Sequence, residues 1–363
     1  MLHLLKIHQI LPTIVYGDAV SNDALALMSI LNKMGINSHI YSENFHPALG
    51  KLVRNMDKLN ASRNTILIYH MSTGSQLSYM IKDIAAPVKI MIYHNITPAD
   101  FFRGYGRENY QLVKDGRDQL SMLKDTFDYS FADSEYNGIE LRELGFKNVK
   151  ELPILIPYGD YNKKPSEDVI HRLSDGNTNI LFLGRIAPNK RQEDIIKSFY
   201  YYKKHIDKSS RLFLVGSYDG MELYYKALKA LIKELELKDV YFTGKVSFEE
   251  ILAYYRTAHV FLSMSEHEGF CVPLIESMYF GVPIIAYKEA AIPYTLNDAG
   301  VMLSSKDHLF TAGLIDRVVR DDKLRTSIIN GQKRRLADFS YDKVANLFKC
   351  YMNKIILESG LGD

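Results

Sequence analysis

The chain has 363 residues, of which 47% are hydrophobic and 24% charged, a composition that supports packed cores and excludes a disordered chain. At roughly 100–200 residues per domain, this length predicts about two domains. Lys and Arg number 45 against 43 Asp and Glu, and this balance of +2 excludes the strongly basic surface by which nucleic-acid-binding proteins hold phosphates.

Cysteine usage and hydropathy bear on the compartment. Only Cys271 and Cys350 are present, too few for a disulfide framework or a four-thiolate zinc site, and this fits a reducing cytosol. The apolar run 1–10 contains two histidines and a lysine and is shorter than the roughly 18–20 residues that span a bilayer, so we interpret it as a buried first strand. We therefore expect a cytoplasmic protein, with peripheral association at the cytoplasmic face of a membrane left open.

Short β-rich runs alternate with longer helical patterns through the first half of the chain. In the helical candidate 18–34, Leu25, Met28 and Leu31 recur every three residues on one face. Strands separated by helices predict a parallel sheet with both faces covered. The predicted strands are 2–9, 37–41, 65–70, 88–94 and 129–132, and the predicted helices are 18–34, 76–84, 109–124 and 136–144.

The second half repeats this plan, so the fold class is α/β with two doubly wound, Rossmann-like domains. Prolines and glycines gather in 153–177, the composition of a connector. We therefore predict domains at 1–164 and 165–338, with a last helix in 339–363 that packs back on the first domain. The predicted strands are 179–183, 211–215, 240–243, 259–264, 283–286 and 301–303, and the predicted helices are 192–205, 220–236, 248–257, 273–280, 306–320 and 341–357.

The densest polar signal is the segment 265–278, which directly follows the predicted strand 259–264. Pro273 fits the first position of a helix, where a missing N–H leaves no bond unmade. The free backbone N–H groups of such a helix start favour a phosphate. Glu276 could accept hydrogen bonds from two vicinal hydroxyls of a ribose, and Glu268 could reach a sugar hydroxyl. Taken alone, both glutamates could equally cap the helix or pair locally.

A second polar group follows the first predicted strand of this half. Gly184 allows a close approach of backbone to ligand, and Arg185 and Lys190 place two cations beside a helix start, as in a diphosphate clamp. Two further strand ends carry glycine, at Gly216 and Gly244. One glycine turn is weak evidence because turns need glycine anyway, but four such loops at one sheet edge indicate a ligand site.

Together these residues resemble the donor-binding domain of the retaining glycosyltransferases of family 4, which have the two-domain GT-B fold. The resemblance is strongest over 180–303 and implies two Rossmann-like domains that face each other across a cleft. The motifs that carry it are Gly184-Arg185 with Lys190, Val215-Gly216, Phe242-Thr243-Gly244, and Glu268 followed after seven residues by Glu276 and then by Gly281-Val282-Pro283.

The resemblance implies a role for each matching residue. Arg185 and Lys190 hold the donor diphosphate, Glu276 binds the ribose hydroxyls, and Glu268 addresses the transferred sugar. One departure is the segment 292–296, which has no glutamate where the family commonly carries one. The implied donor-binding set also includes Gly184, Gly216, Thr243, Gly244, Lys245 and Val246 around the base, Gly269, Phe270, Leu274 and Ile275 before and in the helix, and Gly17 and Asp18 in the first domain.

In the first domain the resemblance is weaker. Asp18 stands where the first long helix opens and either caps it or contacts a substrate. His94 ends a predicted strand, where a lone histidine is usually structural, but the resemblance implies contact with the transferred sugar and makes it a catalytic candidate. Asp133 and His70 end neighbouring strands and are weaker candidates of the same type. The helical stretch 101–124 combines basic and aromatic residues, which fits either a lipid-linked or anionic acceptor or an ordinary solvated helix.

The function implied is a retaining enzyme that transfers a hexose-type sugar from a nucleotide-diphosphate donor to a hydroxyl of a glycan or lipid-linked acceptor, in surface polysaccharide or glycolipid assembly. No Asp-x-Asp pair stands at a predicted strand end, so we expect no metal and no other cofactor. We expect no nucleic-acid partner. Two alternatives stay open: another GT-B reaction such as nucleotide-sugar epimerisation, and a non-catalytic subunit that binds a sugar nucleotide.

Overall fold

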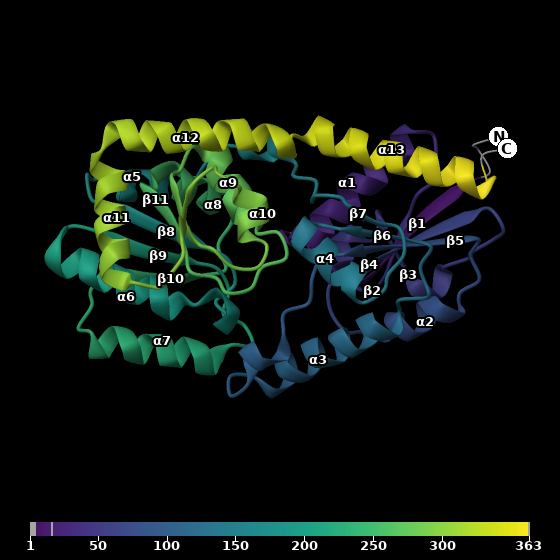
Figure 1. Cartoon of the computed structure of the whole chain (residues 1–363), viewed down its shortest axis with the longest axis horizontal. Helices are drawn as coiled ribbons and strands as arrows, with labels where there is room; N and C mark the ends of the chain where they lie inside the picture. The colour runs from purple at the N-terminus through teal and green to yellow at the C-terminus, as the bar shows by residue number, and fades with distance from the viewer. Residues whose placement is uncertain (1–4, 16, 362–363) are drawn as a thin grey trace. The chain divides into compact units, whose positions relative to one another are not determined.

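The computed structural model describes residues 5–15 and 17–361, which form two compact units. The first unit contains the described residues up to Ala99, then Gln111–Tyr158, then the chain from Phe339 onward. The second contains Asp100–Tyr110 and Gly159–Asp338. Each unit is built on one parallel sheet (Figure 1). The chain thus passes from the first unit to the second after Tyr158, before the sequence-based boundary at 164/165, and a short segment from the first half of the chain also belongs to the second unit.

The first unit has a seven-stranded sheet in the order β3-β2-β1-β4-β5-β6-β7, and all its strand pairs are parallel. The two short strands β3 and β7 lie at the sheet edges, and the sequence analysis did not predict them. Part of the predicted first strand, at 2–4, lies outside the described residues. The strands are β1 (Lys6–Ile14), β2 (Ile40–Phe45), β3 (Val53–Asn55), β4 (Thr65–Met71), β5 (Val88–Tyr93), β6 (Tyr129–Ala132) and β7 (Val149–Glu151).

Helices cover both faces of this sheet because its strands alternate side chains between two cores. On β4, Ile66 and Ile68 pack into one core while Leu67 and Tyr69 pack into the other. The first core is closed by α1 and α13, and the second by α2, α3 and α4. These helices are α1 (Ala19–Lys33), α2 (Leu77–Asp83), α3 (Arg107–Met122), α4 (Glu135–Glu143) and α13 (Tyr341–Ser359).

The C-terminal helix α13 belongs to the first unit although the second unit precedes it in the chain. It lies beside α1 (Figure 1), and its fully buried Phe348 and Met352 pack in the same core as Leu27 and Leu31 of α1. Gly360 ends the helix in a left-handed conformation, which glycine adopts without strain.

The second unit has a six-stranded, wholly parallel sheet in the order β10-β9-β8-β11-β12-β13. Both sheets are therefore doubly wound, as predicted. Helix pairs α6/α11, α5/α8 and α9/α12 pack against one another around it. The strands are β8 (Asn179–Leu183), β9 (Arg211–Val215), β10 (Val240–Gly244), β11 (Val260–Ser263), β12 (Ile284–Tyr287) and β13 (Val301–Leu303).

Three helices of the second unit were not predicted: α5, α10 and α12. The first lies inside the segment expected to be a connector, where Ser166 caps it and two acids occupy its first turn. No helix among residues 5–15 and 17–361 is both long and apolar enough to cross a membrane. The helices of this unit are α5 (Glu167–Leu173), α6 (Gln192–His205), α7 (Glu222–Glu234), α8 (Phe248–Thr257), α9 (Val272–Phe280), α10 (Ile292–Leu296), α11 (His308–Arg320) and α12 (Asp322–Leu336).

Candidate functional site

Two predicted site residues, Lys190 and Glu268, form an ion pair in the second unit. Lys190 ends the short 3₁₀ turn Pro188–Lys190 after β8, and Glu268 lies in the loop after β11. The strands β8 and β11 are neighbours in the parallel sheet, so their carboxyl ends reach the same edge. The Glu268 side chain is only 8% exposed. The predicted cation and the predicted carboxylate therefore occupy one place at this edge.

Arg185, the second predicted cation, is anchored by a residue that the sequence analysis did not single out. Its guanidinium donates to Asn109 Oδ1 at 3.3 Å and to the backbone oxygen of Asp219 at 3.0 Å. Asn109 in turn donates to the backbone oxygen of Gly220 at 2.9 Å. Asn109 belongs to the segment Asp100–Tyr110, which is part of the second unit although 48 residues separate it from Gly159, where the rest of that unit begins.

The predicted glycines sit where the backbone itself is crowded or turned. A Cβ on Gly216, whose φ is +145°, would lie 2.1 Å from the carbonyl oxygen of Gly184. Gly244 has a φ of +68° but open space where its Cβ would be. Gly216 and Gly244 form an isolated antiparallel bridge. The loops after β8, β9 and β10 therefore approach one another through residues that have no side chain.

A charged network supports the loops that carry the ion pair. Arg191, in a left-handed conformation, donates to Glu266 through Nε at 2.6 Å, and its guanidinium lies 5.8 Å from the Phe101 ring centre. Lys306 bonds both Glu266 at 2.6 Å and Asp194 at 2.8 Å. These contacts tie loops after β8, β11 and β13 to the start of α6. Arg191 directly follows the predicted cation Lys190 in the chain, and the structure places it in this network.

Asn189 gives the same two loops a second connection. Its side chain donates to the backbone oxygen of His267 at 3.0 Å, and its backbone oxygen accepts from the N–H of Glu266 at 2.9 Å. This buried asparagine fixes the loop that carries Glu268 against the turn that carries Lys190.

The start of α9 is the predicted phosphate-binding helix terminus. Its N-cap residue Cys271 is left-handed, with φ +69°. The backbone N–H of Leu274 donates to the carbonyl of Cys271 at 3.0 Å. This N–H, which belongs to the predicted phosphate-binding helix start, therefore already has a partner in the structure. Ile275 and Phe270 are buried, and the Phe270 carbonyl accepts a 2.6 Å bond from Thr295. Burial raises the pKa of the Cys271 thiol well above its usual value.

Glu276, one turn into α9, is held at both carboxylate oxygens. Tyr161 donates to Oε1 at 2.9 Å and Tyr255 donates to Oε2 at 2.7 Å. Burial raises the pKa of Glu276, and the two hydroxyls act against that rise. Neither tyrosine was predicted, because nothing in the sequence places Tyr161 or Tyr255 near this helix.

The predicted base-binding segment 243–246 begins with the last two residues of β10 and continues past the end of the strand. Thr243 Oγ1 donates to the carbonyl of Gly244 at 3.0 Å, Lys245 is exposed, and Val246 is half-buried. Gly269 lies beside Glu268 in the loop that precedes α9, where the backbone oxygen of Glu268 accepts from the N–H of Ala291 at 3.3 Å. This segment lies at the carboxyl end of β10 and this loop follows β11, and both carboxyl ends lie at one edge of the parallel sheet.

In the first unit, Asp18 caps α1. Its carboxylate accepts from the N–H of Ser21 at 2.9 Å and from the Ser21 hydroxyl at 2.8 Å. This is the structural role left open in the sequence analysis. Gly17 has a φ of +80° with nothing near its missing side chain, so the turn alone accounts for the glycine.

His94 is the centre of a buried hydrogen-bonded chain. Its Nδ1 lies 2.9 Å from Asp133 Oδ2, its Nε2 lies 2.8 Å from His70 Nδ1, and His70 Nε2 lies 2.8 Å from Gln9 Oε1. The side-chain N–H of Gln9 donates to the carbonyl of Ala24, and the Gln9 side-chain oxygen faces His70. Because an amide oxygen can only accept, His70 donates to Gln9 through Nε2 and accepts from His94 at its other ring nitrogen. The His94 side chain is 1% exposed, and both its ring nitrogens have partners.

Burial and the neighbouring carboxylates shift the pKa of His94 in opposite directions. Burial by itself lowers this pKa, but the carboxylates of Asp133, Asp23 and Asp18 together outweigh burial and raise it. Nearby Asp23, which accepts the N–H of Leu155 at 2.8 Å, has its pKa raised to about 7 by burial. His70 and Asp133, the weaker sequence candidates, thus flank His94 directly.

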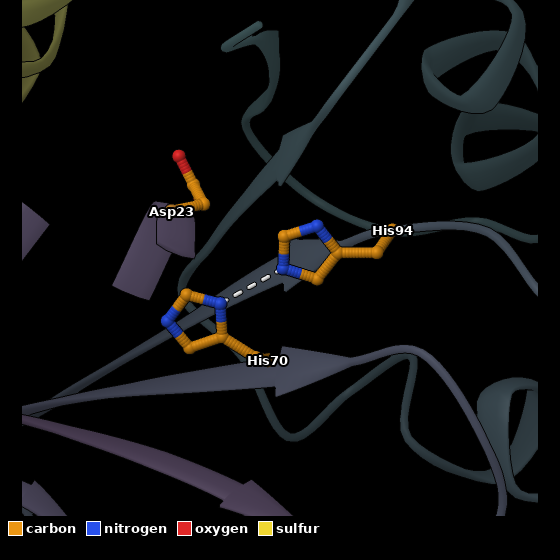
Figure 2. A group of neighbouring side chains, drawn as sticks. All are labelled: Asp23, His70 and His94. Atoms are coloured by element: carbon orange, nitrogen blue, oxygen red, sulfur yellow. Dashed lines mark hydrogen bonds between the residues drawn. The ribbon is translucent and has the colours of Figure 1, made fainter. Parts of the chain in front are cut away.

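Asp23, His70 and His94 could each offer a ligand atom to a metal ion, and these atoms lie within 4.8 Å of one another (Figure 2). The two imidazoles, however, are 2.8 Å apart at their facing nitrogens. Two histidine nitrogens bound to one zinc ion, each about 2.0–2.1 Å from it in tetrahedral geometry, stand roughly 3.4 Å apart. The two rings are therefore hydrogen-bonded to each other, as the dashed line in Figure 2 shows.

Comparison with known proteins finds similarity over the second half of the chain. Residues 163–335 match the family described as "Glycosyl transferases group 1". The chain is 30% identical over 171 residues to the GalNAc-α-(1→4)-GalNAc-α-(1→3)-diNAcBac-PP-undecaprenol α-1,4-N-acetyl-D-galactosaminyltransferase of Campylobacter jejuni. It is 32% identical over 127 residues to the α-monoglucosyldiacylglycerol synthase of Streptococcus pneumoniae. These matches span 46% and 35% of this chain, and 45% and 28% of the relatives, so less than half of either relative is covered.

A solved structure resembles the chain over both units. HepE of Anabaena, crystallised in complex with UDP-glucose, superposes with a TM-score of 0.73 over 96% of this chain and 100% of its own, at 15% identity. This likeness, together with the two doubly wound parallel sheets, confirms the predicted GT-B fold.

Proposed function

Since residues 163–335 carry the glycosyl transferases group 1 domain, we propose that this protein is a retaining glycosyltransferase that uses a nucleotide-diphosphate sugar. The observation that carries the proposal is the Lys190–Glu268 pair, which brings a predicted phosphate cation and a predicted sugar-binding carboxylate together. The two residues stand 78 positions apart in the chain, and both belong to the motif predicted from sequence.

The proposed chemistry relies on charge. Arg185 and Lys190 stabilise the diphosphate as it leaves, a role that a metal ion plays elsewhere, so we propose that transfer is independent of metal. Glu276 binds the ribose, and Glu268 orients the transferred sugar. The bond from the anomeric carbon to the diphosphate breaks, a bond to the acceptor oxygen forms on the same face, and the acceptor proton passes to the leaving phosphate.

The proposed acceptor is a hydroxyl of a lipid-linked glycan or a glycolipid. Two relatives support this class, because their names specify an undecaprenol-linked glycan and a glucosyldiacylglycerol. We propose a cytoplasmic protein that meets such an acceptor at the membrane surface, in polysaccharide or glycolipid assembly.

The test begins with a thermal-shift panel of UDP-, GDP- and ADP-sugars, in which a ligand at about 100 times its Kd adds about 2.7 kcal/mol of stability. The donor that binds is then incubated with and without lipid-linked acceptors, and the product's anomeric configuration is read by NMR. Transfer with retention, undiminished by a chelator, supports the proposal. Epimerised donor without acceptor, binding without turnover, or activity lost to a chelator and restored by Mn²⁺ each contradicts a stated part of it.

A further inference from the structure

Glu276, the proposed ribose ligand, accepts a hydrogen bond from a tyrosine hydroxyl at each of its two carboxylate oxygens. Resting on the proposed function, in which Glu276 binds the ribose, we propose that Tyr161 and Tyr255 are positioning residues that make this site selective for a vicinal diol. The site therefore binds a ribonucleoside diphosphate in preference to the corresponding 2′-deoxyribonucleoside diphosphate.

The hydrogen-bond capacity of the carboxylate carries the argument. An ionised carboxylate offers about four acceptor positions, two on each oxygen. Tyr161 takes one position on Oε1, and Tyr255 takes one on Oε2. One acceptor position is then left on each oxygen, so the group presents two acceptors side by side, which matches the two adjacent hydroxyls of a ribose.

Packing fixes the direction in which these positions point. Tyr255 is 1% exposed, and its ring stacks on Phe280 with centres 5.1 Å apart. Tyr161 is 5% exposed and stacks on Phe248 at 6.0 Å. Because neither ring can follow a rotation of the carboxylate, turning Glu276 breaks at least one tyrosine bond. The carboxylate therefore keeps one orientation when a ligand lacks a hydroxyl.

A fixed carboxylate makes the missing hydroxyl costly. A 2′-deoxy ligand leaves one acceptor position of this half-buried carboxylate without a partner, and such a loss is larger than the gain from an ordinary neutral hydrogen bond. Without a tyrosine, the carboxylate can turn toward the remaining hydroxyl or toward water. Selectivity should then fall more than overall nucleotide affinity.

The experiment compares UDP, GDP and ADP with their 2′-deoxy forms by titration calorimetry on the full chain. We expect the wild type to prefer the ribo form of its nucleotide by about 10- to 100-fold. Tyr255→Phe and Tyr161→Phe, which keep the rings, should reduce that preference to under about 5-fold. Tyr279→Phe is the matched control, because its hydroxyl lies 3.3 Å from Asn162 in the same aromatic cluster and its loss should keep the wild-type preference.

Binding of inorganic pyrophosphate separates the possible failures. If both tyrosine variants bind pyrophosphate as the wild type does and still show the wild-type ribo preference, the inference is overturned. The same holds if the wild type binds ribo and deoxy forms equally. A wild type that binds none of the nucleotides overturns the proposed function, and this inference with it. Two independent variants guard against the loss of folding in one of them.

Discussion

Lys190 and Glu268 neutralise each other in the second unit, and the Glu268 carboxylate is almost fully buried. The proposed phosphate cation and the proposed sugar-binding carboxylate thus form one electrostatic unit before any substrate arrives. A diphosphate that binds here must share Lys190 with Glu268. Substitutions of the two residues should therefore have opposite effects on nucleotide binding.

Removing Lys190 or Arg185, the two cations proposed to hold the donor diphosphate, should weaken stabilisation of the diphosphate. Lys190→Ala or Arg185→Ala is expected to reduce transfer by roughly 10- to 1000-fold, or about 1.4–4 kcal/mol of transition-state stabilisation. The measurement is kcat/KM for the donor identified in the thermal-shift panel. Lys323→Ala, at an exposed position of α12 outside the proposed site, is the control for a general loss of positive charge. Wild-type rates in Lys190→Ala would remove the clamp from the mechanism.

Neutralising the Glu268 carboxylate should affect nucleotide binding and sugar transfer differently. Glu268→Gln releases Lys190 from its partner, so we expect nucleoside-diphosphate affinity to stay equal or rise by a few-fold, since one nearby negative charge is lost. Transfer should nevertheless fall by roughly 100-fold, because the group that orients the sugar has changed. Calorimetry and steady-state rates measure the two quantities separately. A parallel loss of both would show that Glu268 only supports the loop.

Asn109 should act on the donor site through Arg185. We expect Asn109→Ala to weaken donor binding less than Arg185→Ala does, because the guanidinium keeps its bond to the Asp219 carbonyl. In a double-mutant cycle, the two changes should be clearly non-additive, since each removes the same contact. Additive effects would mean that Asn109 stabilises the fold independently of Arg185.

The glycines at the strand ends should respond differently to alanine. In Gly216→Ala, the new Cβ meets the Gly184 carbonyl, and the cost should reach roughly 3 kcal/mol or more because backbone must move. In Gly244→Ala, only the left-handed conformation is penalised, by about 1–2 kcal/mol. Thermal unfolding of the second unit measures both. Equal shifts would contradict the close approach of these two loops.

The stability of the first unit should depend on pH because Asp23 titrates. Its pKa is raised from 3.8 to about 7 in the folded protein, so the folded state holds a proton that the unfolded state has lost between those values. Stability then falls as pH rises through this window, by up to about 1.4 kcal/mol per unit for this group. Asp23→Asn lacks the titration, so its stability relative to the wild type should improve from pH 4 to 7 and level off above. A pH-independent difference would contradict the assignment.

Much of the second unit could be predicted from sequence. All six of its strands were predicted with the observed bounds to within one residue, because each is a short apolar run bounded by turn-forming or polar residues. The motif residues that follow them are local in sequence, and parallel strands bring their ends to one edge. Strand periodicity and strand-end chemistry thus sufficed to predict Lys190 and Glu268 at the same edge.

The sequence by itself determined the two doubly wound sheets and the motif residues, since both arise from local patterns that repeat along the chain. Tertiary structure alone decided which residues hold them: Asn109 against Arg185, the tyrosines on Glu276, and His70 on His94. Such partners are far apart in the chain and of ordinary residue types. Only the packing of strands and helices brings their polar atoms within hydrogen-bond distance, and no local pattern records that packing.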